Sequence, residues 1–527
     1  MEVHMQPFLK VTRQACFKVG LSLLSAATLT TPTFAQDTKP LRIVQGPNFD
    51  TLDPAVSKST PTQVVLRGLF NTLVKWNDPS MSKIIPDLAE SWSSSEDGLV
   101  WTFKLRQGVK FSDGSIFNAE AVKFNIDRIL DPKLGSSNRS QLSDISEVKI
   151  IDPYTVEIVT KAPAPTLLEK LTETYASMSS PTAVKADPSG YSQHPVGTGP
   201  YTLVKWIPGE SLTLKKKTEY FGKPGKSESM VFRPIPEGVA RVIELQTGNA
   251  DIAFNIPPES ASDVKDNNEA ELLVKPSSFQ MFFELNTAKP PFNDPRVRLA
   301  VNYAIDRSAI IEKIMHGYAT VPTGIFPEGI QGRVAQKPYP YDPEKAKELI
   351  AEVYPDGIKE KVVIWTPNGR YPKDKTVSEV VQSYLNAIGI KTEFKVWEWA
   401  AYTKTLYKPN PGVGTGKGSN AANMWLFGTG IVQADYRTRR KFYSTHASNL
   451  TGYNNPKIDT LLDKASTELN YEKRMGYFEE LQDIVWNEAP NALTLYNGVQ
   501  LIGVAKGVKG LEIYSNEFVN LNQVAKE

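Results

Sequence analysis

The sequence predicts an α/β protein built from two or more domains. Its 527 residues are more than one hydrophobic core ordinarily organises. Residues 100–130 have the pattern of a strand, a tight turn and a helix in succession, and residues 237–254 that of a helix, a turn and a strand. The composition, 40% hydrophobic and 22% charged, is typical of a globular chain.

The N-terminus has the pattern of a secretory signal. Three basic residues precede the apolar run 19–29, and Thr33 and Ala35 stand at positions −3 and −1 of a cleavage site. The alternative, an uncleaved anchor, is disfavoured because the run is too short to cross a bilayer. We therefore predict that residues 1–35 are a signal peptide, cleaved after Ala35, and that the mature chain is exported.

Removal of this segment changes the charge of the chain. Residues 1–35 hold three of the 60 basic and one of the 58 acidic residues, so the remaining chain carries 57 of each. A neutral chain has no general attraction to nucleic acid or anionic lipid. The single cysteine, Cys16, precedes the apolar run instead of following it, so we expect neither lipidation nor disulfides.

Residues 40–300 have mixed strand and helix patterns. In 100–105 apolar and polar residues alternate, Asp113 and Gly114 form a tight turn, and Asn118 is expected to cap a helix. The other predicted strands are 41–46, 154–160, 211–217, 230–235 and a buried, parallel-type strand at 250–254.

From about residue 285 the chain becomes more helical. Asp294, Asp306, Asp342 and Asn455 are expected helix N-caps, three of them followed by proline, and Gly317 is expected to end the second helix. The apolar spacing in these helices indicates core faces, not binding sites.

In 395–402, Trp397 and Trp399 are expected to share one strand face. The segment 407–423 is predicted to be a mobile surface loop because it is rich in glycine, proline and asparagine.

No motif indicates catalysis. The run "GTGKGS" has Pro411 where a phosphate-binding loop needs glycine, and Gly418 where it needs serine or threonine. His194, His316 and His446 form no close pair, so we expect no metal and no cofactor. The GxSxG serine is also absent from "GTGPY".

Several segments, taken in order, resemble the extracellular solute-binding proteins of the peptide, opine and nickel group, the receptor subunits of bacterial ABC importers. The chief one is "PDLAESWSSSEDGLVWTFKLRQGVKFSDG" (86–114). The others are "TLDPA" (51–55), "PVGTGPYTLVKWIPGESLTL" (195–214), "FELNTAKPPFNDPRVRLAVNYAIDR" (283–307), "YDPEKAKELIAE" (341–352), "GRYPKDKTVSEVVQSYLNAIGI" (369–390) and "YNNPKIDTLLDKA" (453–465).

The resemblance implies a two-lobed periplasmic binding protein fold with an extra subdomain in the larger lobe. Carried over, lobe I is 36–284, with the subdomain at about 75–195, and lobe II is 285–494. Residues 495–527 then return to lobe I. The crossing strands are expected near 282–286 and 492–497, and the strand–turn–helix of 100–130 belongs to the subdomain.

The resemblance also implies ligand-binding residues. Arg370 resembles the arginine that meets the ligand carboxylate in dipeptide-binding members, and a surface arginine is the alternative. Trp399 matches a cleft tryptophan, with a core role as the alternative. Where many members carry an acid after a glycine-rich turn, this chain has Gln433, with Asp435 two residues later. Asp435 is thus the expected partner of a ligand amine, and strict dipeptide specificity is in doubt.

The function implied is that of a monomeric, non-enzymatic periplasmic receptor. It would deliver peptides or peptide-like solutes to permease subunits of an ABC importer in the inner membrane. Glutathione, an opine, haem or a metal chelate remain alternative ligands on the same fold, and a secreted enzyme or chaperone-like protein is a further alternative.

Overall fold

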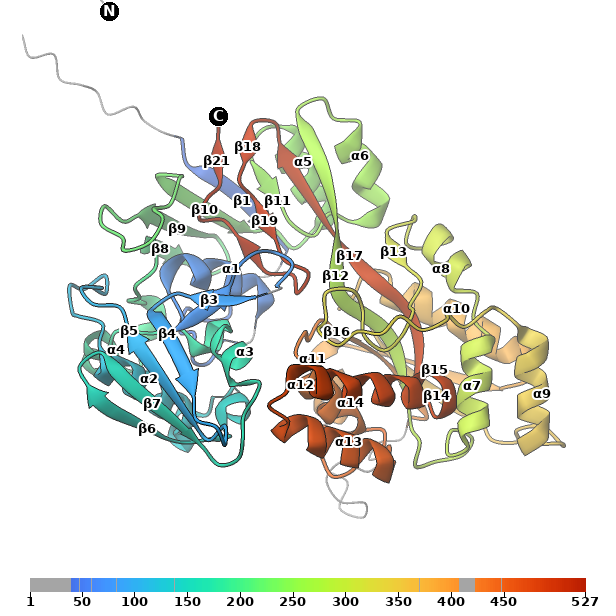
Figure 1. Ribbon diagram of the computed structural model, residues 1–527. Coiled ribbons are helices and arrows are strands. Elements are labelled where there is room, and N and C mark those ends of the chain that lie inside the picture. The colour runs from blue at the N-terminus through green and yellow to red at the C-terminus, as the bar shows by residue number, and fades with distance from the viewer. Residues whose placement is uncertain are drawn as a thin grey trace, which may run out of the picture. The chain divides into compact units, whose positions relative to one another are not determined.

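A long mixed β-sheet forms the framework of the protein (Figure 1). The computed structural model describes residues 39–527, except 47, 58, 82, 137, 369, 407–421 and 447. Within that range the sheet has 11 strands. Its strands, in spatial order, are β15 (Thr392–Trp397), β14 (Val362–Pro367), β16 (Met424–Thr429), β12 (Ala270–Leu285), β17 (Ala492–Ala505), β11 (Ile252–Ala253), β1 (Leu41–Gln45), β10 (Ser229–Pro234), β9 (Ser211–Lys216) and β8 (Tyr201–Ile207), with β13 (Ala319–Thr320) paired to β17.

Two long antiparallel strands, β12 and β17, occupy the middle of this sheet; Figure 1 shows them side by side in green and red. They pair from Ala270 opposite Ala505 to Glu284 opposite Ala492, with register shifts near Pro276 and Met281. β12 also pairs with β16 on one side, and β17 with β11 on the other. These strands include the predicted crossing segments, and they join the two ends of the sheet through backbone hydrogen bonds.

A second, four-stranded antiparallel sheet lies in the N-terminal half. Its order is β4 (Ala89–Ser94), β5 (Val100–Leu105), β7 (Thr155–Thr160) and β6 (Ile145–Asp152). The predicted alternation is confirmed, because Trp101, Phe103 and Leu105 are buried and Lys104 is exposed. Its core is separate from that of the long sheet. The predicted subdomain of about 75–195 includes this region, and its bounds remain a prediction.

The smaller pairs are β2 (Val74–Trp76) with β3 (Ile84–Pro86), β18 (Val508–Lys509) with β21 (Ala525–Lys526), and β19 (Glu512–Ile513) with β20 (Val519–Asn520). The helices are α1 (Thr60–Leu69), α2 (Ala119–Leu130), α3 (Leu167–Leu171), α4 (Pro181–Ala186), α5 (Gly238–Gln246), α6 (Ala261–Lys265), α7 (Pro295–Tyr303), α8 (Arg307–Lys313), α9 (Pro343–Val353), α10 (Asp374–Ala387), α11 (Trp399–Leu406), α12 (Ala434–Phe442), α13 (Pro456–Thr467) and α14 (Tyr471–Asp483). Among the described residues, no helix combines the length and apolar character that a membrane span requires.

The predicted helix caps are confirmed. The side chains of Asn118, Asp294, Asp306, Asp342 and Asn455 each accept a backbone N–H in the first turn of α2, α7, α8, α9 and α13. A capped first turn satisfies donors that have no partner within the helix. These caps fix where the helices begin and which apolar face each one buries.

Two local predictions are wrong. Helix α8 ends at Lys313, before Gly317, because His316 and Gly317 both have positive φ and form a turn beyond the helix. Trp397 and Trp399 do not share a strand face, because β15 ends at Trp397 and Trp399 opens α11. Glu398 ends the strand by accepting the backbone N–H of Ala401 through its carboxylate. The predicted loop 407–423 lies almost entirely outside the described residues.

Candidate functional site

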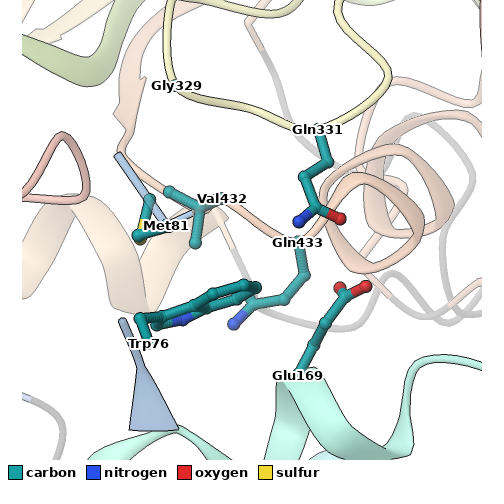
Figure 2. A pocket seen from close by; sticks show the side chains of 7 residues that line it. All are labelled: Trp76, Met81, Glu169, Gly329, Gln331, Val432 and Gln433. Carbon is teal, nitrogen blue, oxygen red and sulfur yellow. The ribbon is translucent and has the colours of Figure 1, made fainter. Parts of the chain in front are cut away.

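A pocket is lined by residues from four segments that are far apart in the sequence (Figure 2). The lining residues are Trp76, Met81, Glu169, Gly329, Gln331, Val432 and Gln433. Figure 2 shows the side chains of Glu169, Gln331 and Gln433 gathered around the space beside the Trp76 indole. The hollow measures about 300 Å³ including the solvent within it.

Two carboxyl groups enter this region from α3 and the residues after it. Glu169 lines the pocket, and Glu173 is buried behind it. Burial raises the pKa of Glu169 to about 7, with Arg474 opposing and Asp435 reinforcing the shift. Burial also raises the pKa of Glu173 to about 7, although Arg67 and Gln433 favour its charged form. Both groups therefore change charge near neutral pH.

Gln433 connects the two sides of the pocket. Its side-chain amide donates to the Glu173 carboxylate at 2.5 Å, across 260 residues of sequence. Gln433 precedes α12 and leaves its side chain free of any capping bond to that helix. The position expected for an acid thus carries an amide that can donate to a carboxylate on the facing segment. Gln433, predicted as a ligand-binding residue, lies in the pocket.

Asp435 lies in the first turn of α12, half-buried, close enough to Glu169 to raise its pKa. Its carboxylate pairs with Arg439 one turn later at 3.1 Å. Arg439 also reaches Asp463 at 3.3 Å. The predicted amine partner is thus near the pocket and already has a cationic partner on its own helix.

Arg370 is exposed and is not among the residues that line the pocket. Its backbone N–H donates to the Asp374 carboxylate at 2.9 Å, which fixes the turn before α10. Its guanidinium lies 5.0 Å from the Tyr371 ring centre. It is also near Glu517, where burial raises the carboxyl pKa and Arg370 opposes that shift.

Trp399 is the first residue of α11, and its side chain falls outside the described residues. The neighbouring Trp397 packs against Trp365 at 4.8 Å and belongs to a core cluster. The structure thus places Gln433 in the pocket and Asp435 near it, whereas Arg370 is exposed and does not line it.

Six lining residues were not predicted: Trp76, Met81, Glu169, Gly329, Gln331 and Val432. Trp76 had a weak signal, since it is an aromatic residue before an Asn-Asp-Pro turn. No sequence signal marked Glu169 as a pocket residue, because its helix is short and its neighbours Leu167 and Leu171 have an ordinary core spacing. Among the described residues, no group of three or more His, Cys, Asp or Glu side chains is arranged to hold a metal ion.

Comparison with known proteins decides the family. Residues 83–430 match the model of the bacterial extracellular solute-binding proteins, family 5. The chain belongs to this family. It is 34% identical over 488 residues to the glutathione-binding protein GsiB of Shigella flexneri, which covers 90% of this chain and 93% of that protein.

Two solved family 5 structures share the fold. NikZ from Campylobacter jejuni, in complex with Ni(L-His), has 26% identity and a TM-score of 0.76 over 92% of this chain and 97% of its own. The periplasmic binding protein DppA from Helicobacter pylori, in complex with the peptide STSA, has 26% identity and a TM-score of 0.77 over 92% and 98%. The predicted two-lobed fold is confirmed, and so is the role of a substrate-binding component of an ABC importer.

Proposed function

We propose that this family 5 protein captures a short peptide or peptide-like solute with a free amine and a free carboxylate, and that glutathione is the first candidate. The relative from Shigella flexneri, 34% identical to this chain, is named for glutathione. The observation that carries the proposal is the acidic character of the pocket region: Glu169 lines the pocket, Asp435 is close enough to raise its pKa, and Glu173 bonds to the lining residue Gln433. An ammonium group suits such a pocket because it compensates carboxylates that burial otherwise disfavours.

The amine end of the solute is assigned to Asp435 and Gln433. Asp435 supplies a carboxylate at the start of α12, and Gln433 supplies its side-chain amide oxygen as a second acceptor for the ammonium, while its NH2 group keeps its bond to Glu173. Arg439 holds the Asp435 carboxylate in one orientation. An ammonium ion approaching from the pocket then completes the coordination of an oriented carboxylate.

The carboxylate end is assigned to Arg370, and Trp399 is assigned to the middle of the solute. A planar guanidinium binds a carboxylate through two parallel hydrogen bonds. Arg370 is exposed in the present structure, so its assignment requires that the solute cover it. The opposing observation is its proximity to Glu517, which supplies a competing carboxylate.

The protein is proposed to act as a monomer without catalytic activity. It would deliver its solute to permease subunits in the inner membrane after removal of residues 1–35. N-terminal sequencing and intact mass of the exported protein test the processing. The expected N-terminus is Gln36, without an acyl group.

Calorimetry on the purified protein tests the ligand. Reduced glutathione, a tetrapeptide, an opine and Ni(L-His) are titrated separately into the wild type. We expect glutathione or the tetrapeptide to bind with micromolar affinity, about −8 kcal/mol. Binding of the opine or the nickel chelate alone would contradict a peptide-like ligand.

Substitutions then test the anchors. Asp435→Asn and Arg370→Ala are each expected to weaken binding about 30-fold or more, because each leaves a desolvated charge of the solute unpaired, a cost of about 2 kcal/mol or more. Arg296→Ala is the matched control, since Arg296 pairs with Asp294 on the surface at the start of α7. If both variants bind within threefold of the wild type, these residues are not the anchors.

A further inference from the structure

A second hollow lies between α12 and the long sheet, separate from the pocket of Figure 2. Its floor consists of alternate residues of β12, Gln280, Phe282 and Glu284, together with Thr494 of β17. Its roof is the face of α12 that carries Arg437 and Lys441, which are four residues apart and so share that face. The hollow measures about 430 Å³, including the solvent that reaches it.

The charges around this hollow do not balance. Lys441 forms an ion pair with Glu284, and the Trp425 indole donates to the same carboxylate at 2.6 Å. Arg437 is buried, and its bonds go to uncharged acceptors: the carbonyls of Ser278 and Ile431 and the side-chain oxygen of Gln280. Within the part of the chain that the structure describes, two cations therefore face one carboxylate.

The apolar surroundings strengthen the effect of this excess charge. The ammonium of Lys441 lies 5.0 Å from the Phe282 ring centre and 4.5 Å from that of Phe427. Ile325 and Phe326 form a further wall. Burial lowers the pKa of Arg437 to about 9 and that of Lys441 to about 7, so an anion bound here would favour the charged form of both side chains. In such surroundings a lone positive charge is costly, and a counter-ion reduces that cost.

An independent observation concerns Thr494. This side chain is 4% exposed, and its hydroxyl has no hydrogen-bond partner among the described residues. Thr494 is opposite Phe282 in the strand register, so it lies on the floor of the same hollow. A buried hydroxyl ordinarily finds a partner, and a donor beside two cations is suited to an anion.

We infer that this hollow binds one small monovalent anion, of chloride size or the size of a single carboxylate, between Arg437, Lys441 and the hydroxyl of Thr494. Two sources share this chemistry: a free halide ion and a carboxylate of the transported solute. The bound anion ties α12 to β12 and β17. Because α12 begins next to Gln433 and carries Asp435, occupancy of this hollow fixes the helix that forms one side of the candidate site.

Thermal unfolding of the full chain tests the inference. Sodium chloride is exchanged for the bulky sulfonate MES at constant ionic strength. The unfolding midpoint of the wild type is expected to rise with chloride and then saturate, as binding to one site requires. Thr494→Val preserves the shape of the side chain and removes the hydroxyl, and the half-saturating chloride concentration is expected to rise about tenfold.

Thr366→Val is the matched control. Thr366 is equally buried in β14, but its hydroxyl already bonds to Ser378. This variant is expected to be less stable than the wild type. Its half-saturating chloride concentration, however, is expected to equal that of the wild type. An unchanged chloride dependence in Thr494→Val overturns the inference, and so does a wild-type midpoint that does not respond to chloride.

Crystals grown in bromide locate the ion and distinguish its source. An anomalous peak between Arg437 and Thr494 is expected, and its absence at saturating bromide overturns the site. Glutathione is then added to the same crystals. Loss of the peak assigns the hollow to a carboxylate of the solute, and its persistence assigns it to a free ion.

Discussion

At the scale of single residues, Glu173 is the most informative group. It is 7% exposed, and its carboxyl pKa is raised to about 7 by burial. A raised acid pKa means that the folded state holds a proton that the unfolded state releases. Its contribution to stability is therefore complete below pH 4.5 and is lost as the pH rises through 7. Unfolding of the wild type should become easier over that interval.

Replacing Glu173 by glutamine removes this dependence. The variant Glu173→Gln is expected to match the wild type at pH 4.5 and to exceed it at pH 8 by up to about 3 kcal/mol in the free energy of unfolding. Urea denaturation at the two pH values measures the difference. Glu271→Gln, at an exposed position of β12, is the control. Its free energy of unfolding should differ from that of the wild type by the same amount at pH 4.5 and at pH 8. Equal gains for both variants would contradict a protonated Glu173.

At the scale of elements, the turn before α10 connects stability to the candidate site. The buried Asp374 carboxylate accepts the backbone N–H groups of Arg370 and Tyr371, at 2.9 and 3.1 Å. Asp374→Ala is therefore expected to cost about 1–2 kcal/mol of stability, as the loss of a helix cap does. It should also weaken solute binding if Arg370 is an anchor, because the turn no longer fixes that residue.

The cap of α9 provides the control for Asp374. Asp342→Ala removes a comparable bond, from the Lys345 N–H at 2.9 Å, away from the lining residues. Denaturation and calorimetry on both variants separate the two effects. We expect the two variants to lose comparable stability. We expect weaker solute binding only in Asp374→Ala. If both variants bind the solute equally well, Arg370 is not a ligand-binding residue.

Elements were predicted well where the signal is local. The helix starting at Pro456 follows from its cap Asn455 and from an apolar face that is buried as expected. The prediction of a strand that includes Trp399 was wrong, because the alternation of residues alone did not show that Glu398 caps a helix there. The pocket was mostly missed for a different reason. Trp76, Glu169 and Gln331 are far apart in sequence, and only the tertiary fold brings them together.

At the scale of the whole molecule, side-chain contacts join segments that the prediction places in different lobes. Two of them are the bond from Gln433 to Glu173 and the ion pair of Lys373 with Glu259 at 2.8 Å. Hinged receptors close when a ligand binds the closed form more tightly than the open form. We therefore expect the solute to reduce the radius of gyration measured by small-angle X-ray scattering.

A double variant makes that measurement decisive. Gln433→Ala with Lys373→Ala removes both contacts and should expand the protein without solute. The wild type should become more compact when saturated with solute, and Asp435→Asn should not do so at the same concentration. A receptor that closes on its solute would be excluded by two results together. The radius of the wild type would be the same with and without solute, and the radius of the double variant would equal that of the wild type.

The pairing of β17 with β11 also determines when the protein can fold. β11 is held between β1, near the start of the described chain, and β17, near its end. Asp251, next to β11, bonds to Arg42 and Lys526. During synthesis the N-terminal part of the chain leaves the ribosome first. This end of the sheet, however, lacks a strand and one of its ion pairs until the last thirty or so residues have been made. We therefore expect this end of the sheet to form only after the C-terminal residues have been made.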